Sequence, residues 1–341
     1  LAIGTTSGDS IIRESMKVFP YQPGKSLLVF STFSMATPKA NLRQRVGFFG
    51  AQNGIFFETD GTTYNMVIRS YSSGVVVEDR IAQADWNGDT LLGTGGVSNL
   101  SGIELNTAVD QIFWTDVEWL GVASVRVGFV IDGTFYTCHT FNHANQAGNT
   151  TTYMTTATLP VRYEITNTGP TLSTSTMTQI CSSVISEGGY TQTGPTESAG
   201  TGINVKRLTT SGTYYPIASI RLASSRLDAI AAPTQVDVLS PTVNYYRWVL
   251  LKNTTLTGAT WAGTSSTGSV QYDTAATAVS GGTEIASGYV SSRELTTLAA
   301  TYFQNQLGRT LAGVSDTVTL ALVATSNNAD VLAQLGWQEL T

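Results

Sequence analysis

The chain has 341 residues, of which 41% are hydrophobic and only 12% are Asp, Glu, Lys or Arg. This balance, together with 33 glycines, is typical of short strands joined by small polar turns and argues against long solvated helices. The formal net charge of −6 argues against a nucleic-acid partner, because sequence-independent affinity for nucleic acid comes mostly from clustered Lys and Arg.

The first predicted elements are an N-terminal arm, residues 1–25, and a domain of residues 26–187. The arm has little periodicity and ends in a turn formed by Pro20, Pro23 and Gly24. The strands that follow are separated by residue pairs that favour tight turns, which is the rhythm of a meander in a sandwich or jelly roll. These pairs are Asn53-Gly54, Asp60-Gly61 and Ser73-Gly74.

A β-hairpin is the most specific element of this domain. Val127, Phe129 and Ile131 recur at spacing two, as in a strand with one buried face. The pair Asp132-Gly133 then supplies the residues that a type I′ turn needs at positive φ. We therefore expect the three apolar side chains to point inward and the pair to form the tip.

Residues 188–202 are the best candidate for a linker between two domains. Their Gly, Ser and Thr bury too little apolar area to offset an ordering cost of about 1–2 kcal/mol per residue. The preceding residues 173–187 fit a short helix or a strand, and their Thr and Ser favour the strand. The length also favours two domains, because single cores rarely grow beyond about 250–300 residues.

The second domain, residues 203–341, again consists of short strand-like segments. Val318, Leu320 and Leu322 alternate along one of them, and a turn at Asn327-Asn328 leads into the last strand, which predicts a terminal hairpin. Residues 293–311 fit either a helix face or a strand. The expected fold class is all-β, with two antiparallel, jelly-roll-like β-sandwich domains.

The cysteines, the length of the apolar runs and the first residues of the chain bear on its cellular compartment. Cys138 and Cys181 are too few for a disulfide scaffold, and two buried thiols in a reducing cytosol are favoured over one bridge. No run of 18 apolar residues occurs, so no membrane span is expected. The start at Leu1, without Met or a signal peptide, indicates a position inside a longer polypeptide.

Seven phrases of the sequence carry a family resemblance. They are YQPGKSLLVFSTF (Tyr21 to Phe33), RQRVGFFGAQNGIFFETDGTT (Arg43 to Thr63), DWNGDTLLGTG (Asp85 to Gly95), FWTDVEWLGVASVRVGFVIDG (Phe113 to Gly133), HTFNHAN (His139 to Asn145), YMTTATLPVRYEI (Tyr153 to Ile165) and QICSSVISEGGY (Gln179 to Tyr190). Together they resemble a module of virion structural proteins in marine tailed phages and in large DNA viruses of algae and amoebae. The resemblance implies a β-sandwich on the outside of a virus particle, and it implies no catalytic residues.

The two histidines, His139 and His143, lie four residues apart. On a helix this spacing would present both rings to one metal ion, but the segment is typical of a strand entering a turn and lacks the glutamate of an H-E-x-x-H site. We expect packed polar rings whose nitrogens bond to the backbone. Neither a metal nor a cofactor is predicted here.

A weak calcium candidate lies in the loop after residue 84. Asp85, Asn87 and Asp89 alternate as oxygen ligands do in a Ca²⁺ loop. However, Thr90 and Gly96 stand where an EF-hand needs its turn glycine and its bidentate glutamate. The favoured interpretation is a loop in which these side chains bond nearby backbone N–H groups.

Two further pairs of residues are candidates for binding or catalysis. Asp116 and Glu118, two apart on a strand, could reach the shorter separation of glycosidase carboxylates, about 5 Å. Solvent-facing alternation explains them equally well, and no catalytic residue is predicted. Trp86 and Trp261 lie in Gly-rich loops, where exposed rings could stack on sugars or anchor a subunit contact.

The sequence therefore predicts a non-enzymatic virion structural protein on the particle exterior, assembled in the host cytoplasm. Its partners would be copies of itself, with a homotrimer expected, and other virion proteins, because repeated modest contacts become stable on a symmetric particle. The alternative is a receptor- or carbohydrate-binding module of a fibre or spike that binds a host surface glycan. A polysaccharide depolymerase is a third candidate. The sequence does not encode a location at head, neck or tail.

Overall fold

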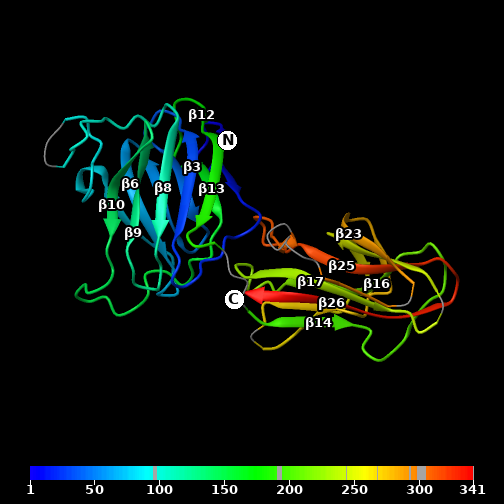
Figure 1. The fold of residues 1–341 in the computed structure, drawn as a ribbon. Helices are drawn as coiled ribbons and strands as arrows, with labels where there is room; N and C mark the ends of the chain where they lie inside the picture. The colour runs from blue at the N-terminus through cyan, green and yellow to red at the C-terminus, as the bar shows by residue number, and fades with distance from the viewer. Residues whose placement is uncertain are drawn as a thin grey trace. The chain divides into compact units, whose positions relative to one another are not determined.

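The computed structural model describes residues 1–94, 98–189, 194–242, 244–266, 268–291, 293–297 and 305–340. The chain divides into two compact units, unit 1 (Leu1–Thr191) and unit 2 (Gln192–Thr341). Each unit consists of antiparallel sheets, so the predicted all-β class is confirmed (Figure 1). The division between the units falls within the predicted linker, residues 188–202.

Unit 1 is built from two main sheets. One has the order β2 (Ser10–Glu14), β11 (Val161–Asn167), β4 (Leu42–Phe49), β5 (Gly54–Asp60), β6 (Thr63–Ser70), β7 (Val77–Ala82). The other has the order β10 (Thr134–Phe141), β9 (Val125–Ile131), β8 (Gln111–Val117), β3 (Leu27–Ser34), β13 (Thr178–Ser186) (Figure 1). A short pair, β1 (Ala2–Ile3) with β12 (Ser175–Thr176), and the 3₁₀ turn η1 (Gln83–Asp85) complete its named elements.

The core of unit 1 lies between these two sheets. Phe57 of β5 is fully buried, and its ring centroid lies 5.2 Å from that of Phe129 and 6.0 Å from that of Phe113, both on the opposite sheet. Burying a side chain of this size contributes about 1.5–3 kcal/mol, so alternate residues of each strand join the sheets into a sandwich.

The predicted β9–β10 hairpin is confirmed. Asp132 and Gly133 have φ of 51° and 77°, as a type I′ turn requires, and Ile131 pairs with Thr134 across it. Val127 and Phe129 are fully buried, and Ile131 packs against the same core.

The N-terminal arm predicted for residues 1–25 is wrong in its first half. β2 pairs with β11 at the edge of the six-stranded sheet, and the amino group of Leu1 donates a hydrogen bond to the Met177 carbonyl at 2.7 Å. This edge strand forms through backbone pairing. Its sequence shows no alternation of apolar and polar residues, because Ile11 and Ile12 are adjacent. Residues 173–187, by contrast, form strands as predicted.

Unit 2 also contains two main sheets. One has the order β14 (Thr196–Gly200), β26 (Ala329–Leu340), β17 (Ile230–Leu239), β24 (Arg293–Thr297), with β15 (Lys206–Leu208) also pairing with β26. The other has the order β20 (Ala262–Gly263), β21 (Val270–Asp273), β16 (Tyr215–Leu222), β25 (Thr317–Ala324), β18 (Tyr246–Lys252), β23 (Thr283–Val290) (Figure 1). A further pair joins β19 (Thr255–Thr257) to β22 (Ala278–Ser280).

Three sequence expectations for this part of the chain need correction or restriction. The linker is shorter than residues 188–202, because residues 196–200 form β14 and pair with β26. The terminal hairpin is wrong, because β25 and β26 belong to different sheets and the turn at Asn328, with φ of 56°, connects the two layers. Residues 293–297 form a strand, and residues 298–304 lie outside the described residues.

The outer face of the six-stranded sheet of unit 1 carries a buried set of alternating charges, here called the Arg–Glu network. Glu58 is fully buried and accepts hydrogen bonds from Arg45 at 2.6 Å and from Arg80 at 2.9 Å. The guanidinium groups of Arg45, Arg69 and Arg162 lie over the rings of Phe49 or Phe56, with centroid distances of 5.1–5.4 Å. The network consists of Glu14, Arg45, Glu58, Arg69, Glu78, Arg80, Arg162 and Glu164.

Candidate binding site

A groove of about 510 Å³ opens at one edge of the unit 1 sandwich, between the edge strands β7 and β10. We call it the β7–β10 groove. Its walls come from β6 and β7 on one side and from the end of β10 and residues 142–153 on the other. Sheet edges that are not closed by a further strand leave this space between the layers. The lining includes Asp79, His139, Asn142, His143, Asn149 and Tyr153.

Strand register brings an acid and a histidine to the inner side of this edge. Asp79 pairs with Ile68, an inward residue of β6, so it shares the inner side of its sheet. A bulge in β10 between Thr137 and His139 puts His139 opposite the inward residue Val127. Without the extra residue of the bulge, His139 would lie on the outer face.

Hydrogen bonds define the tautomers of both histidines. Nδ1 of His139 accepts a hydrogen bond from the Asn87 backbone N–H at 3.2 Å, so the ring proton of the neutral form is on Nε2. Nδ1 of His143 lies 3.0 Å from the Ala123 carbonyl and must donate to it, which leaves Nε2 as an acceptor. The expectation of packed rings bonded to the backbone thus holds for one nitrogen of each ring.

The charge state of the two rings follows from their surroundings. Burial lowers the pKa of His139 below its ordinary range, and the nearby Asp79 carboxylate opposes this shift without reversing it. Burial likewise lowers the pKa of His143, against the Ala123 carbonyl and Asp79. Both imidazoles are therefore neutral at pH 7, and the groove presents one donor and one acceptor nitrogen.

A stacked pair of rings forms part of the wall. The rings of His143 and Tyr153 lie 3.8 Å apart between centroids and 8° from parallel. The turn between them contains Asn145 in the left-handed region, with φ of 57°, which allows the chain to fold back and join the two rings. The stack fixes the orientation of the His143 ring and its free nitrogen.

Two amide side chains each keep one hydrogen-bonding atom without a protein partner among the described residues. The Asn142 Oδ1 accepts from the Ser124 hydroxyl at 3.1 Å, and its Nδ2 has no bond. The Asn149 Nδ2 donates to the His143 carbonyl at 3.3 Å, and its Oδ1 has no bond. The Asp79 carboxylate likewise has no ion-pair or hydrogen-bond partner in the described part of the chain. The groove therefore offers both donors and acceptors to a ligand.

In the calcium candidate, the side chains of Asn87 and Asp89 bond to the backbone. Asn87 makes two bonds to the backbone of Thr140, through Nδ2 at 2.9 Å and Oδ1 at 2.8 Å. Asp89 accepts from the backbone N–H groups of Leu91 and Ser101, at 3.0 and 2.8 Å, and Asp85 is exposed. Within the described ranges, no group of three or more His, Cys, Asp or Glu could hold a metal ion. The loop is the backbone-bonded turn that the sequence favoured.

Trp86 is wrong as a surface binding residue, because its side chain is only 3% exposed and its Nε1–H donates to the Ile81 carbonyl at 3.1 Å. Trp261 is half-buried, and the Arg221 guanidinium lies over its ring at 4.2 Å from the centroid. Its ring therefore has one face occupied by a cation within the chain. Neither tryptophan lines the β7–β10 groove.

The proposed carboxylate pair is not assembled into a site. Asp116 lies on β8 and forms an ion pair with Arg126 on β9, and Glu118 is exposed just after β8. Neither residue lines the β7–β10 groove. The two cysteines are free thiols, with Cys138 buried and Cys181 exposed. No helix among the described residues has the length and hydrophobicity needed to cross a membrane.

Comparisons with known proteins give distant likenesses. No protein-family model matches the chain, and no curated protein matches it in sequence. An endo-β-1,4-glucuronan lyase from the fungus Trichoderma reesei shares 9% identity at a TM-score of 0.32, covering 54% of this chain and 78% of its own. The ligand-binding domain of botulinum neurotoxin serotype D, in complex with N-acetylneuraminic acid, shares 10% identity at a TM-score of 0.29, covering 100% of this chain and 87% of its own. Mouse laminin α1 domains LG4-5 share 8% identity at a TM-score of 0.23, covering 99% and 80%. At these TM-scores the proteins support no inference about this chain.

Proposed function

We propose that the chain is a non-enzymatic saccharide-binding protein and that the β7–β10 groove is its binding site. The observation that carries the proposal is the set of polar atoms in the groove that lack protein partners. Asp79, Asn142 and Asn149 are exposed, so water bonds to their polar atoms in the free chain and folding leaves these atoms available to a ligand. Here a donor nitrogen, an acceptor nitrogen, two amide atoms and a carboxylate all face one space.

The chemistry of the groove favours an uncharged sugar. Neutral hydroxyls both donate and accept, as the mixed set of imidazole and amide atoms requires. No Lys or Arg among the described residues lines the groove, and the Asp79 carboxylate would repel an acidic sugar. The volume of about 510 Å³ lies within the range of pockets for small ligands, about 300–1,000 Å³.

Binding without cleavage is supported by the number of acids. Glycoside hydrolysis uses two carboxyl groups about 5–9.5 Å apart, one to protonate the leaving group and one to act as nucleophile or base. Asp79 is the one carboxylate among the described residues that line this groove. A single acid can accept hydrogen bonds from hydroxyls, but it cannot fill both roles.

The experiment is calorimetric titration of the purified chain with neutral monosaccharides and short glycans. Asp79→Ala should weaken binding about tenfold, since a hydrogen bond to a charged group contributes about 1.5–3 kcal/mol. His143→Ala should weaken it comparably, because the fixed acceptor is lost. Asp110→Asn, an exposed acid outside the groove, is the matched control and should bind normally. Equal affinity in Asp79→Ala and the control would contradict the proposal, as would release of reducing sugar.

A second candidate function is assembly, which one observation favours. The outer face of the five-stranded sheet of unit 1 has a shallow hollow of about 260 Å³, whose lining includes the apolar residues Phe30, Ile112, Val130 and Phe135. Phe135 is 53% exposed and contacts the rings of Phe30 and Trp114, at 5.9 and 5.6 Å between centroids. We propose that a second copy of the chain packs here, in the homotrimer expected from the sequence. Mass measurement in solution tests this: Phe135→Ser should give monomers, and an unchanged mass would contradict it.

The resemblance to virion structural proteins supports a place on the exterior of a virus particle, with other virion proteins as neighbours. Both candidate functions suit that place, since an exterior protein binds its neighbours on one surface and presents another to the host. Antibodies against unit 1 should then label intact particles. Labelling of disrupted particles alone would contradict an exterior position.

A further inference from the structure

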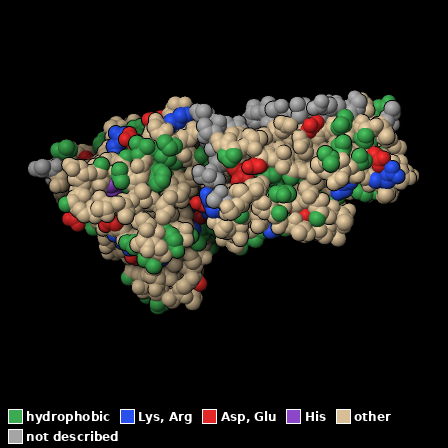
Figure 2. Space-filling view, turned by 90° about the horizontal axis from the view of Figure 1, so that it is seen from below, with side chains coloured by type: hydrophobic (Ala, Val, Ile, Leu, Met, Phe, Trp, Pro, Cys, Tyr) green, Lys and Arg blue, Asp and Glu red, His purple; other side chains and the backbone are tan. Residues whose placement is uncertain are grey.

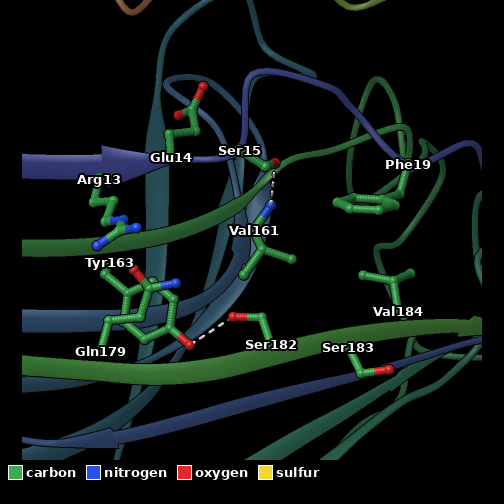
Figure 3. A pocket seen from close by; sticks show the side chains of 10 residues that line it. All are labelled: Arg13, Glu14, Ser15, Phe19, Val161, Tyr163, Gln179, Ser182, Ser183 and Val184. Atoms are coloured by element: carbon green, nitrogen blue, oxygen red, sulfur yellow. Dashed lines mark hydrogen bonds between the residues drawn. The ribbon is translucent and has the colours of Figure 1, made fainter. Parts of the chain in front are cut away.

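A second groove, of about 500 Å³, opens at the opposite edge of the unit 1 sandwich, between β2 and β13. We call it the β2–β13 groove, and Figure 3 shows its lining. Arg13 pairs with the inward residue Tyr163, so both project to the inner side of the six-stranded sheet. From the other sheet, Gln179 pairs with the inward residue Phe33 and Ser182 with Ser31. Side chains of both sheets thus line one space.

The charge of this groove is opposite to that of the β7–β10 groove. The Arg13 guanidinium has no ion-pair or hydrogen-bond partner among the residues that the structure describes. Glu14 also lines the groove, but its Oε2 accepts from Arg162 at 3.0 Å on the outer face, and in Figure 3 its carboxylate points away from Tyr163. The exposed Arg13 side chain therefore brings to the groove a positive charge that has no ionic partner among the described residues.

An unpaired acceptor lies in the same groove. The Oε1 of Gln179 is buried and has no hydrogen-bond partner within the described part of the chain. In Figure 3 Gln179 lies at the same end of the groove as Arg13. A buried amide oxygen is normally hydrogen-bonded, so the Gln179 oxygen is available to a donor group of a ligand.

Hydroxyl groups and an apolar wall complete the lining. The Tyr163 hydroxyl donates to the Cys181 carbonyl at 3.0 Å and lies 2.8 Å from the Ser182 oxygen, whose proton it accepts. Ser182 therefore keeps lone pairs for a ligand. Phe19 and Val184 face each other at the other end of the groove (Figure 3). The lining combines a cation, acceptors and an apolar surface.

We propose that the β2–β13 groove binds an acidic sugar unit, such as a uronic or sialic acid. The carboxylate would pair with the Arg13 guanidinium, which matches a carboxylate with two parallel N–H donors. A ring hydroxyl would donate to Gln179 Oε1, and the C–H face of the ring would pack on Phe19. A simple carboxylate such as acetate satisfies Arg13 but brings no donor to Gln179. The inference is independent of the neutral-sugar site, which lies at the other edge and carries an acid.

The test is titration of the full chain with three probes: glucuronic acid or N-acetylneuraminic acid, the methyl ester of the same sugar, and acetate. The acidic sugar should bind, and the ester and acetate should bind at least tenfold more weakly. Arg13→Gln and Gln179→Leu should each weaken binding of the acidic sugar about tenfold or more. Arg207→Gln, an exposed arginine of unit 2, is the control and should bind as the unchanged chain does.

Two results would overturn the proposal. Equal binding of acetate and the acidic sugar would show that only a carboxylate is recognised. Unchanged affinity in Arg13→Gln, with an unaltered melting temperature, would place the acid elsewhere. Asp79→Ala separates this site from the neutral-sugar site, because it should leave acidic-sugar binding unchanged. Failure of neutral sugars to bind would therefore not affect the outcome here.

Discussion

Strand β7 contributes to two regions of unit 1 that use the same residue types in opposite ways. Glu78 and Arg80 face outward and join the Arg–Glu network, where each has at least one ionic partner. Asp79, between them, faces the β7–β10 groove and has no partner among the described residues. Because side chains alternate between the two faces of a strand, Glu78 and Arg80 join the paired charges on one face, while Asp79 lies unpaired on the other.

The two regions differ in how many of their charged and polar groups have a bonding partner within the folded chain. In the Arg–Glu network each carboxylate meets a guanidinium, and the rings of Phe49 and Phe56 pack beneath. Such a surface has little capacity left for a ligand, and its residues act on stability. In the groove, bonding capacity remains after folding, and under the proposed function its residues act on recognition. Substitutions on the two sides of β7 should therefore separate stability from binding.

The largest effect is expected for Glu58, which bonds to both Arg45 and Arg80 and is fully buried. Glu58→Ala leaves buried guanidinium charge without its partner, which costs about 3–5 kcal/mol in comparable pairs. Chemical denaturation followed by a probe in unit 1 measures this change. A loss below about 1 kcal/mol would show that the network is not structural.

The second-largest effect is expected on acidification, which should weaken the Arg–Glu network. Burial raises the pKa of Glu78, but Arg45, Arg69 and Arg80 outweigh it and hold the pKa below the usual range. Because the folded-state pKa is depressed, the stabilisation is present above the unfolded value, about 4.3, and is lost as pH falls through the folded value. Glu78→Gln should flatten the pH dependence of unit 1 stability below pH 5. An unchanged slope would assign the acid sensitivity to other groups.

Binding in the β7–β10 groove should also depend on pH, but in a higher range. His139 and His143 have pKa values lowered by burial, so both are neutral above about pH 6.5. As pH falls through the lowered pKa, protonation turns the His143 acceptor into a donor, and neutral-sugar affinity should drop several-fold. Titrations between pH 7.5 and pH 5 measure this drop. His143→Gln, which keeps an acceptor without titrating, should lose much of the dependence.

The smallest effect on stability is expected for Asp79. Because its carboxylate is exposed and unpaired in the described structure, Asp79→Asn should change the free energy of unfolding by no more than about 0.5 kcal/mol. The same substitution should weaken neutral-sugar binding. A stability loss comparable to that of Glu58→Ala would contradict the distinction between the two faces of β7.

Local patterns predicted part of this fold from the sequence. The β9–β10 hairpin follows from alternation and from the Asp132-Gly133 turn, because both signals lie within a few residues. The turn at Asn328 has similar chemistry, yet it connects two sheets, because turn residues set the local backbone and not the partner of the next strand. Sheet membership depends on pairing between strands distant in sequence.

The binding groove was less accessible to sequence reasoning. His139 faces inward because of a bulge, and Asp79 meets it because β7 and β10 are the edge strands at the same end of two sheets. Neither relation leaves a local pattern. Trp86 shows the reverse error, since its Gly-rich surroundings favoured exposure while its ring packs into the core. The sequence signal for this groove was the segment from His139 to Asn145, which gathers polar residues just after a strand.

The most direct test of the saccharide-binding account is amide chemical-shift mapping of the deuterated chain during titration with a neutral glycan. The account predicts that perturbed amides cluster in residues 77–81 of β7, in residues 139–143 and in residues 149–153, with Asp79→Ala reducing the shifts. Perturbations confined to unit 2 or to the Arg–Glu network, or no perturbation with any neutral glycan, would contradict it.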